Sequence, residues 1–234
     1  MKEKIITRAK EDLPLYFQDF EKFWNDSVTV ISDDDLYEIY RATLVFKNWK
    51  ISLHTLGIKD FDLILDELFE DINSSFFLAL YGQYRSAHMH MRSSIELSLQ
   101  LLYFLHHPIE FQRWKEGEYV IKIDKLQDYL AKHPYFKDDI TALLQSIFTN
   151  WKLFSKHIHG ESPIFFQCEK DIRKTNTFSG KDFGIWRSNF GKNVYYINKL
   201  FLLFFKADFN RIPEVSRNIL MELLKDDEKD TMNV

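Results

Sequence analysis

Residues 84–96 bring together side chains that bind phosphate and move protons. The segment reads Tyr-Arg-Ser-Ala-His-Met-His-Met-Arg-Ser-Ser-Ile-Glu. At about 100° per residue on a helix, a single stripe about 80° wide holds Arg85, His88, Arg92 and Glu96. Arg92 and Glu96 are four residues apart and can pair directly. The stripe borders the apolar face of the helix, so we expect its charges to be partly buried and paired.

A second segment of interest, residues 151–160, reads Trp-Lys-Leu-Phe-Ser-Lys-His-Ile-His-Gly. On the same helical projection Ser155 and His159 share its apolar face. We therefore expect the two helices to pack, with Ser155 or His159 within hydrogen-bonding distance of Arg92 or Glu96. Such a cluster could cleave a phosphodiester, because an imidazole moves protons and a guanidinium stabilises developing negative charge.

The same cluster has a purely structural interpretation. A buried Arg–Glu pair with a histidine and a serine beside it can be a satisfied polar network that fixes how two helices pack. On the projection His90 points to the side of Ser86 and Leu97, and His157 points away from the apolar face. Both interpretations of the stripe stay open.

No cofactor or metal is expected. The chain has no Gly-rich phosphate loop, dinucleotide fingerprint or HExxH motif. Cys168 is the single cysteine, which excludes an internal disulfide and a cysteine-based zinc site. His106 and His107 precede Pro108, and we interpret the pair as a helix-end feature rather than as metal ligands.

The elements that must position these side chains are helices. Only 7 Gly and 5 Pro occur in 234 residues, against 22 Phe, which favours long helices with few turns around an apolar core. Periodicity predicts helices at residues 13–25, 36–56, 60–71, 74–105, 109–116, 123–132, 137–159, 183–205 and 212–225. The Ser32-Asp-Asp-Asp run is expected to start the second of these, and the helix at 74–105 is expected to bend near Gly82. We interpret 162–181 as irregular and 226–234 as a fraying polar tail.

The predicted fold is therefore an all-α helical bundle of about five long helices with short accessory helices. One domain is expected over residues 1–234: an N-terminal helix and connector at 1–32, the bundle at 33–211, and a terminal helix and tail at 212–234. The net charge of −4 gives no global basic field for nucleic acid. The most apolar run, 194–205, is interrupted by Asn198 and Lys199, so we expect no membrane span and a cytoplasmic protein.

One resemblance adds to this interpretation. Residues 81–97, followed by Tyr-Phe-Leu-His-His-Pro at 103–108 and Phe-Ser-Lys-His-Ile-His-Gly at 154–160, resemble a group of bacterial helical proteins and, through it, the HEPN superfamily. The resemblance covers about residues 74–160. The hallmark of that superfamily is an Arg followed after four to six residues by a His, and Arg85 and His90 match it, with Ser86 beside the Arg.

The resemblance implies a metal-independent endoribonuclease of a bacterial defence or toxin–antitoxin system, with RNA as substrate and a site built across a homodimer. The candidate catalytic residues are then Arg85, His90, Arg92, Glu96, Ser155 and His159. The alternative is a noncatalytic helical interaction module, such as an antitoxin, an immunity protein or a regulatory subunit, which binds a partner protein. The acidic balance favours the alternative, and the polar stripe beside the core favours the nuclease.

Overall fold

The computed structural model describes residues 31–136, 139–159 and 178–232, together with scattered positions before residue 31. Every regular element in these ranges is a helix, which confirms the predicted all-α class. The predicted helix at 13–25, apart from its last residue, and the irregular stretch up to residue 177 lie outside the described residues.

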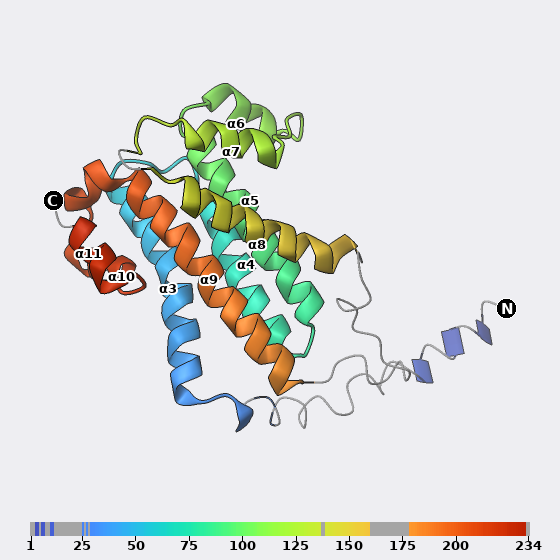
Figure 1. Ribbon diagram of the computed structural model, residues 1–234. Coiled ribbons are helices and arrows are strands. Elements are labelled where there is room, and N and C mark those ends of the chain that lie inside the picture. The colour runs from blue at the N-terminus through green and yellow to red at the C-terminus, as the bar shows by residue number, and fades with distance from the viewer. Residues whose placement is uncertain are drawn as a thin grey trace.

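Five long helices form the bundle, accompanied by shorter elements (Figure 1). The long helices are α3 (Asp33–Thr55), α4 (Asp62–Leu80), α5 (Tyr84–Phe104), α8 (Thr141–His159) and α9 (Gly180–Phe204). The short elements are α6 (Pro108–Lys115), α7 (Ile123–Ala131), the 3-10 helix η3 (Lys206–Arg211), α10 (Glu214–Met221) and α11 (Asp226–Met232). Helices α6 and α7 lie at one end of the bundle, and α10 and α11 lie beside α3 (Figure 1). Helix α5 is central, because α4, α8, α9 and α7 all pack against it.

The start of α3 follows the predicted signal. The Ser32 hydroxyl accepts from the Asp35 backbone N–H at 3.1 Å, and the Asp35 carboxylate accepts from the Ser32 N–H. This reciprocal pairing satisfies two amides that the helix itself cannot bond. Asp35 also forms an ion pair with Arg187, which joins the start of α3 to α9.

The predicted single helix at 74–105 is wrong, because the chain reverses inside it. Helix α4 continues to Leu80, and α5 begins at Tyr84. Between them Gly82 has a φ of +69°, a left-handed conformation that favours glycine. The Gly82 and Gln83 amides donate to the last carbonyls of α4, at 3.0 and 2.8 Å, which ends that helix. Gly82 is thus a helix stop rather than a bend, and α4 and α5 lie side by side (Figure 1).

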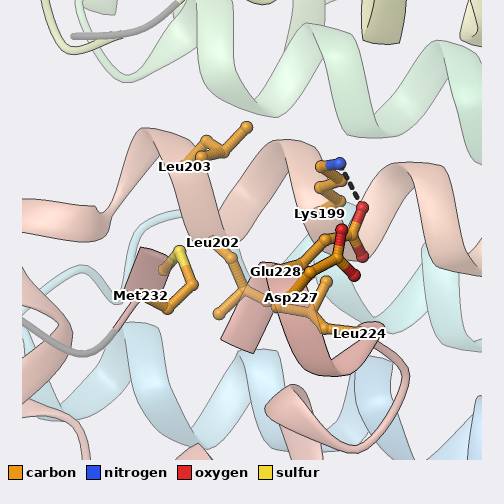
Figure 2. A pocket seen from close by; sticks show the side chains of 7 residues that line it. All are labelled: Lys199, Leu202, Leu203, Leu224, Asp227, Glu228 and Met232. Carbon is orange, nitrogen blue, oxygen red and sulfur yellow. Dashed lines mark hydrogen bonds and ion pairs between the residues drawn. The ribbon is translucent and has the colours of Figure 1, made fainter. Parts of the chain in front are cut away.

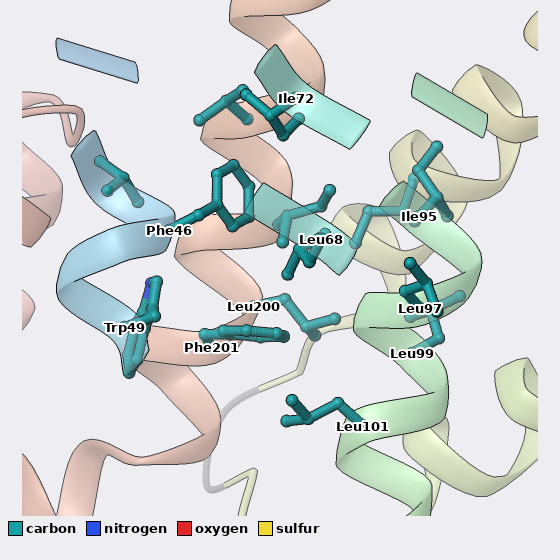
Figure 3. Close-up of a cluster of buried hydrophobic side chains, with 14 of the residues drawn as sticks. Phe46, Trp49, Leu68, Ile72, Ile95, Leu97, Leu99, Leu101, Leu200 and Phe201 are labelled. Carbon is teal, nitrogen blue, oxygen red and sulfur yellow. The ribbon is translucent and has the colours of Figure 1, made fainter. Parts of the chain in front are cut away.

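The interior is a continuous apolar cluster to which every long helix contributes. Figure 3 shows its centre, where rings from α3 and α9 meet aliphatic side chains from α4 and α5. The labelled residues are Phe46, Trp49, Leu68, Ile72, Ile95, Leu97, Leu99, Leu101, Leu200 and Phe201. The indole of Trp49 packs edge-on against Phe201, with ring centroids 5.3 Å apart.

A few buried polar side chains determine how the helices align within this apolar interior. The Trp49 indole N–H donates to Asn198 at 2.8 Å, and the Asn198 amide donates to the Leu220 carbonyl at 2.7 Å. Asn198 therefore links α3, α9 and α10. The Trp186 indole N–H donates to Ser75 at 3.0 Å and links α9 to α4. Each bond satisfies a polar atom that would be costly to bury alone.

The predicted fraying of residues 226–234 is wrong for 226–232, which form α11. Met232 is buried, and the Glu228 carboxylate binds Lys199 and Tyr195 of α9, each at 2.5 Å. Around this attachment lies a small pocket of about 260 Å³ with an apolar wall and a charged rim (Figure 2). No helix in the described ranges is both long enough and apolar enough to cross a bilayer.

Candidate functional site

Helices α5 and α8 pack against each other as predicted, and Trp151 makes the contact. Arg92 and Glu96 form the expected ion pair at 2.8 Å. The Trp151 indole N–H donates to the same Glu96 oxygen at 2.8 Å, and the Arg92 guanidinium lies 5.1 Å from the centre of the Trp151 ring. The pair is therefore held by a hydrogen bond and a cation–π contact from the second helix.

The predicted contact of Ser155 or His159 with this pair is wrong. Ser155 is buried, but its hydroxyl donates to the Trp151 carbonyl of its own helix at 2.8 Å. His159 is the last residue of α8, is exposed, and makes no hydrogen bond or ion pair with any described residue. The large indole fills the space where the two helices meet, and a short hydroxyl one turn later bonds its own backbone instead.

A second polar cluster forms where the start of α5 meets the end of α8. The Arg85 guanidinium donates to the Ile158 carbonyl at 2.7 Å, near the negative end of the α8 dipole. The rings of His88 and His157 stack with centroids 4.0 Å apart and an angle of 6° between their planes. The prediction that His157 points away is therefore wrong, since α5 and α9 cover that side of α8.

His88 is only 2% exposed and is held as a neutral imidazole. Its Nδ1 lies 2.6 Å from the Tyr84 carbonyl and so carries the proton, while Nε2 accepts from Asn189 of α9 at 3.2 Å. Burial, and then the neighbouring His157, lower the pKa of His88 to about 4. Burial and the nearby Arg85 also lower the pKa of His157. Both rings are thus uncharged at neutral pH.

His90 lies on the opposite edge of α5 and is held by a residue that sequence reasoning missed. Its Nδ1 is 2.7 Å from a carboxylate oxygen of Asp71 on α4. Asp71 is 4% exposed, and its other oxygen has no hydrogen-bond partner. The His90 side chain is 36% exposed, and its Nε2 bonds no described residue. A signal was present in the sequence, because Asp71 shares the apolar face of its helix with Ile64 and Leu68.

This pair is the arrangement in the described residues that most resembles acid–base machinery. A buried carboxylate that accepts from Nδ1 fixes the orientation of the ring and leaves Nε2 to exchange protons with a ligand. Arg85 and His90 are separated by about 7.5 Å along α5 and about 140° around it. The part of the α5 surface between these two directions carries Met89, whose side chain is exposed, and Ser86 and Ser93, whose side chains are partly exposed.

The predicted site residues thus fall into three places rather than one. Arg92, Glu96 and Ser155 belong to the Trp151 contact, Arg85 to the stacked histidines, and His90 to Asp71, while His159 stands apart. His106 and His107 lie between α5 and α6, as expected for a helix end, and His107 stacks on Tyr103 at 3.8 Å. Within the described ranges, no group of three or more His, Cys, Asp or Glu side chains could hold a metal ion.

Comparisons with known proteins leave the site to be interpreted from its geometry. No family model matches the chain, and neither a curated protein nor a solved structure matches it.

Proposed function

We propose that this protein is a HEPN-like, metal-independent endoribonuclease in which His90 is the catalytic acid–base residue. The Asp71–His90 contact is the observation that carries the proposal. Burying a carboxylate with one oxygen unsatisfied is unfavourable, and orienting an accessible imidazole is a function that would maintain it. The proposal rests in addition on the resemblance of Arg85 and His90 to the superfamily hallmark.

The chemistry requires no metal, because RNA carries its own nucleophile. Nε2 of His90 removes the proton from a ribose 2′-hydroxyl, and that oxygen attacks the adjacent phosphorus. The bond from phosphorus to the 5′-oxygen breaks, and the protonated imidazole returns the proton to the leaving oxygen. The products are a 2′,3′-cyclic phosphate and a free 5′-hydroxyl. Asp71 stabilises the imidazolium between the two transfers, and Arg85, five residues earlier on α5, offsets the charge of the phosphate.

In this proposal the remaining predicted residues have a supporting role. The Arg92–Glu96 pair holds α5 against α8 through Trp151. Ser155 bonds only its own helix, and His159 takes no part in proton transfer. The catalytic set is then His90 and Arg85, with Asp71 as the positioning residue.

The test is cleavage of tRNA and of total RNA by the purified protein in the presence of EDTA. We expect His90→Gln to reduce the rate by ~10²–10⁴-fold. His159→Ala is the matched control and should cleave like the parent protein, because its side chain is exposed and unpaired among the described residues. Asp71→Asn should reduce the rate less than His90→Gln and should shift its pH profile. A parent protein without cleavage, or a His90→Gln variant with normal cleavage, would contradict the proposal.

The noncatalytic interaction module is the second candidate, and a different observation favours it. Helix α3 exposes four large apolar side chains, as expected of a surface that binds protein. A nuclease toxin should arrest growth when it is expressed, and His90→Gln should relieve the arrest. A protein that neither arrests growth nor cleaves RNA would support the module instead.

A further inference from the structure

Helix α3 carries a line of exposed apolar side chains on the side away from the core. Tyr37, Tyr40, Leu44 and Ile51 are each between 45% and 61% exposed. Their spacings of three, four and seven residues place all four within about 60° of one another on the helix. This is the spacing of a helix–helix seam rather than of scattered surface residues. We call these four residues the α3 seam.

The seam continues onto the neighbouring helix. Tyr40 contacts Phe76 of α4 with ring centroids 5.9 Å apart, and Phe76 in turn contacts Phe77 at 5.7 Å. Phe77 is itself about half exposed. The opposite side of α3 is filled by core residues such as Phe46 and Trp49. Helix α3 therefore packs one side into the core and exposes a second apolar side to water. An exposed apolar face of this kind is typical of a binding surface.

We propose that the α3 seam pairs with the α3 seam of a second copy of this chain, in antiparallel orientation about a two-fold axis at Leu44. The proposal is independent of the nuclease assignment. Tyr37 and Ile51 each lie seven residues from Leu44, so the axis sets Tyr37 of one subunit against the partner subunit's Ile51. Leu44 then meets its own copy. A two-fold interface requires such self-complementarity, which a surface evolved for an unrelated partner does not need.

The charges along the seam agree with this register. Asp33 and Thr55 lie eleven residues from Leu44 on either side, so that the carboxylate faces a hydroxyl. Lys47 is exposed and makes no ion pair with any described residue. The register brings Lys47 of the partner subunit close to Tyr40, where an ammonium and an aromatic ring attract each other. Neither Asp33 nor Lys47 is set against its own copy, so the pairing creates no like-charge contact on the seam.

The size of the seam indicates the strength of the dimer. A single helix pair with one flanking aromatic ring lies at the small end of specific interfaces, which bury roughly 1,200–2,000 Å² in total. We therefore expect a reversible dimer with a dissociation constant of about 1–100 μM.

Sedimentation velocity of the full chain between about 1 and about 300 μM tests the proposal. The parent protein should pass from monomer to dimer over this range. Leu44→Glu places two carboxylates on the axis and should weaken the dimer at least about 100-fold. Ile109→Glu, at an exposed apolar position on α6, is the matched control and should dimerise like the parent. Circular dichroism at the same concentrations checks that both variants are folded.

Cross-linking tests the position of the axis. In a Cys168→Ser background, Leu44→Cys should form a disulfide-linked dimer under mild oxidation, because only a residue on the axis meets its own copy. Ile109→Cys should cross-link no faster than random collision. A parent protein that stays monomeric at every concentration would overturn the proposal. So would a dimer that Leu44→Glu leaves intact, or equal cross-linking of the two cysteine variants.

Discussion

The histidines of this chain show how much the surroundings of a side chain decide. His88 is sealed between α5, α8 and α9 with both nitrogens bonded, so it has no route to a ligand. His159 is accessible, but no described side chain orients it. His90 alone of these three combines a fixed ring with an open nitrogen. Position in the tertiary structure, rather than residue type, therefore selects the proposed acid–base residue.

The buried state of His88 should make stability depend on pH. Its pKa is about 4 in the fold against 6.5 when free, so between these values the unfolded chain binds the extra proton. Stability is thus fully present above pH 6.5 and falls as the pH drops toward 4. This group alone should contribute a loss of ~3 kcal/mol over that interval. Urea unfolding at a series of pH values measures it.

His88→Gln is the matched variant for this pH series, because it keeps a polar side chain without a titratable ring. Its stability should change less between pH 6.5 and 4 than that of the parent. Some dependence should persist, because burial also lowers the pKa of His157, His106 and His133. An unchanged pH dependence would contradict the assigned environment of His88.

The Trp151 contact gives a second prediction at this scale. Trp151→Phe keeps an aromatic ring beside Arg92 but removes the N–H that donates to Glu96, and should cost about 1 kcal/mol of unfolding free energy. Ser155→Ala should change stability by less than about 0.5 kcal/mol, because that hydroxyl bonds only its own helix. Thermal melts of both variants make the comparison. A larger loss of stability for Ser155→Ala than for Trp151→Phe would instead support the contact of Ser155 with Arg92 or Glu96 that the sequence predicted.

At the scale of elements, the end of α4 and the start of α5 decide whether Asp71 and His90 can meet. The chain has few glycines, and Gly82 is used where the backbone must turn with a positive φ. Without that turn α4 and α5 would form one continuous rod. Asp71 and His90 would then lie about 28 Å apart along it, instead of in contact.

Two glycine substitutions should therefore have opposite signs. Gly82→Ala forces a side chain into the left-handed conformation and should destabilise by about 1–2 kcal/mol. Gly191→Ala lies within α9, where an added methyl group meets no atom within 4 Å apart from its own stretch of helix, and should stabilise by up to about 1 kcal/mol. Chemical denaturation of both variants measures the difference. Equal effects would show that the turn at Gly82 is not required.

At the scale of the whole molecule, the bundle is held by a shared apolar interior and aligned by a few buried hydrogen bonds. Asn198 is the clearest case, because it is fully buried and joins α9 both to α10 and to α3, which is distant in sequence. An amide in the middle of an apolar helix face weakens hydrophobic burial, but it permits only one alignment of α3, α9 and α10.

Replacing Asn198 by Leu should destabilise the whole fold by about 3 kcal/mol, because the Trp49 N–H and the Leu220 carbonyl lose their partners inside the core. The double variant Asn198→Leu, Trp49→Phe should lose less unfolding free energy than the sum of the two single losses. Trp49→Phe removes the indole N–H that Asn198→Leu alone would leave buried without an acceptor. Circular dichroism melts of the three variants measure the coupling. Strict additivity would show that the two side chains act separately.

The sequence by itself determined the fold class and most of the helices. Low Gly and Pro content, the Ser32 start signal, Pro108 and the apolar periodicity are local features, and local features specify helices. The Arg92–Glu96 pair was predictable for the same reason, because residues four positions apart on one helix are neighbours. The reversal at Gly82 was missed, because a glycine within a periodic segment is compatible with both a bend and a stop.

Only the tertiary structure decided which polar groups meet across helices. A helical projection tells which face a residue occupies, but not the height at which two helices touch or which large side chain fills the crossing. Trp151 therefore took the place predicted for Ser155 and His159, and His157 was covered by neighbours that its own helix does not reveal. Asp71 and His90 lie 19 residues apart, on helices whose antiparallel alignment depends on one turn and a shared core. That alignment is a property of packing, and packing couples residues that no local pattern connects.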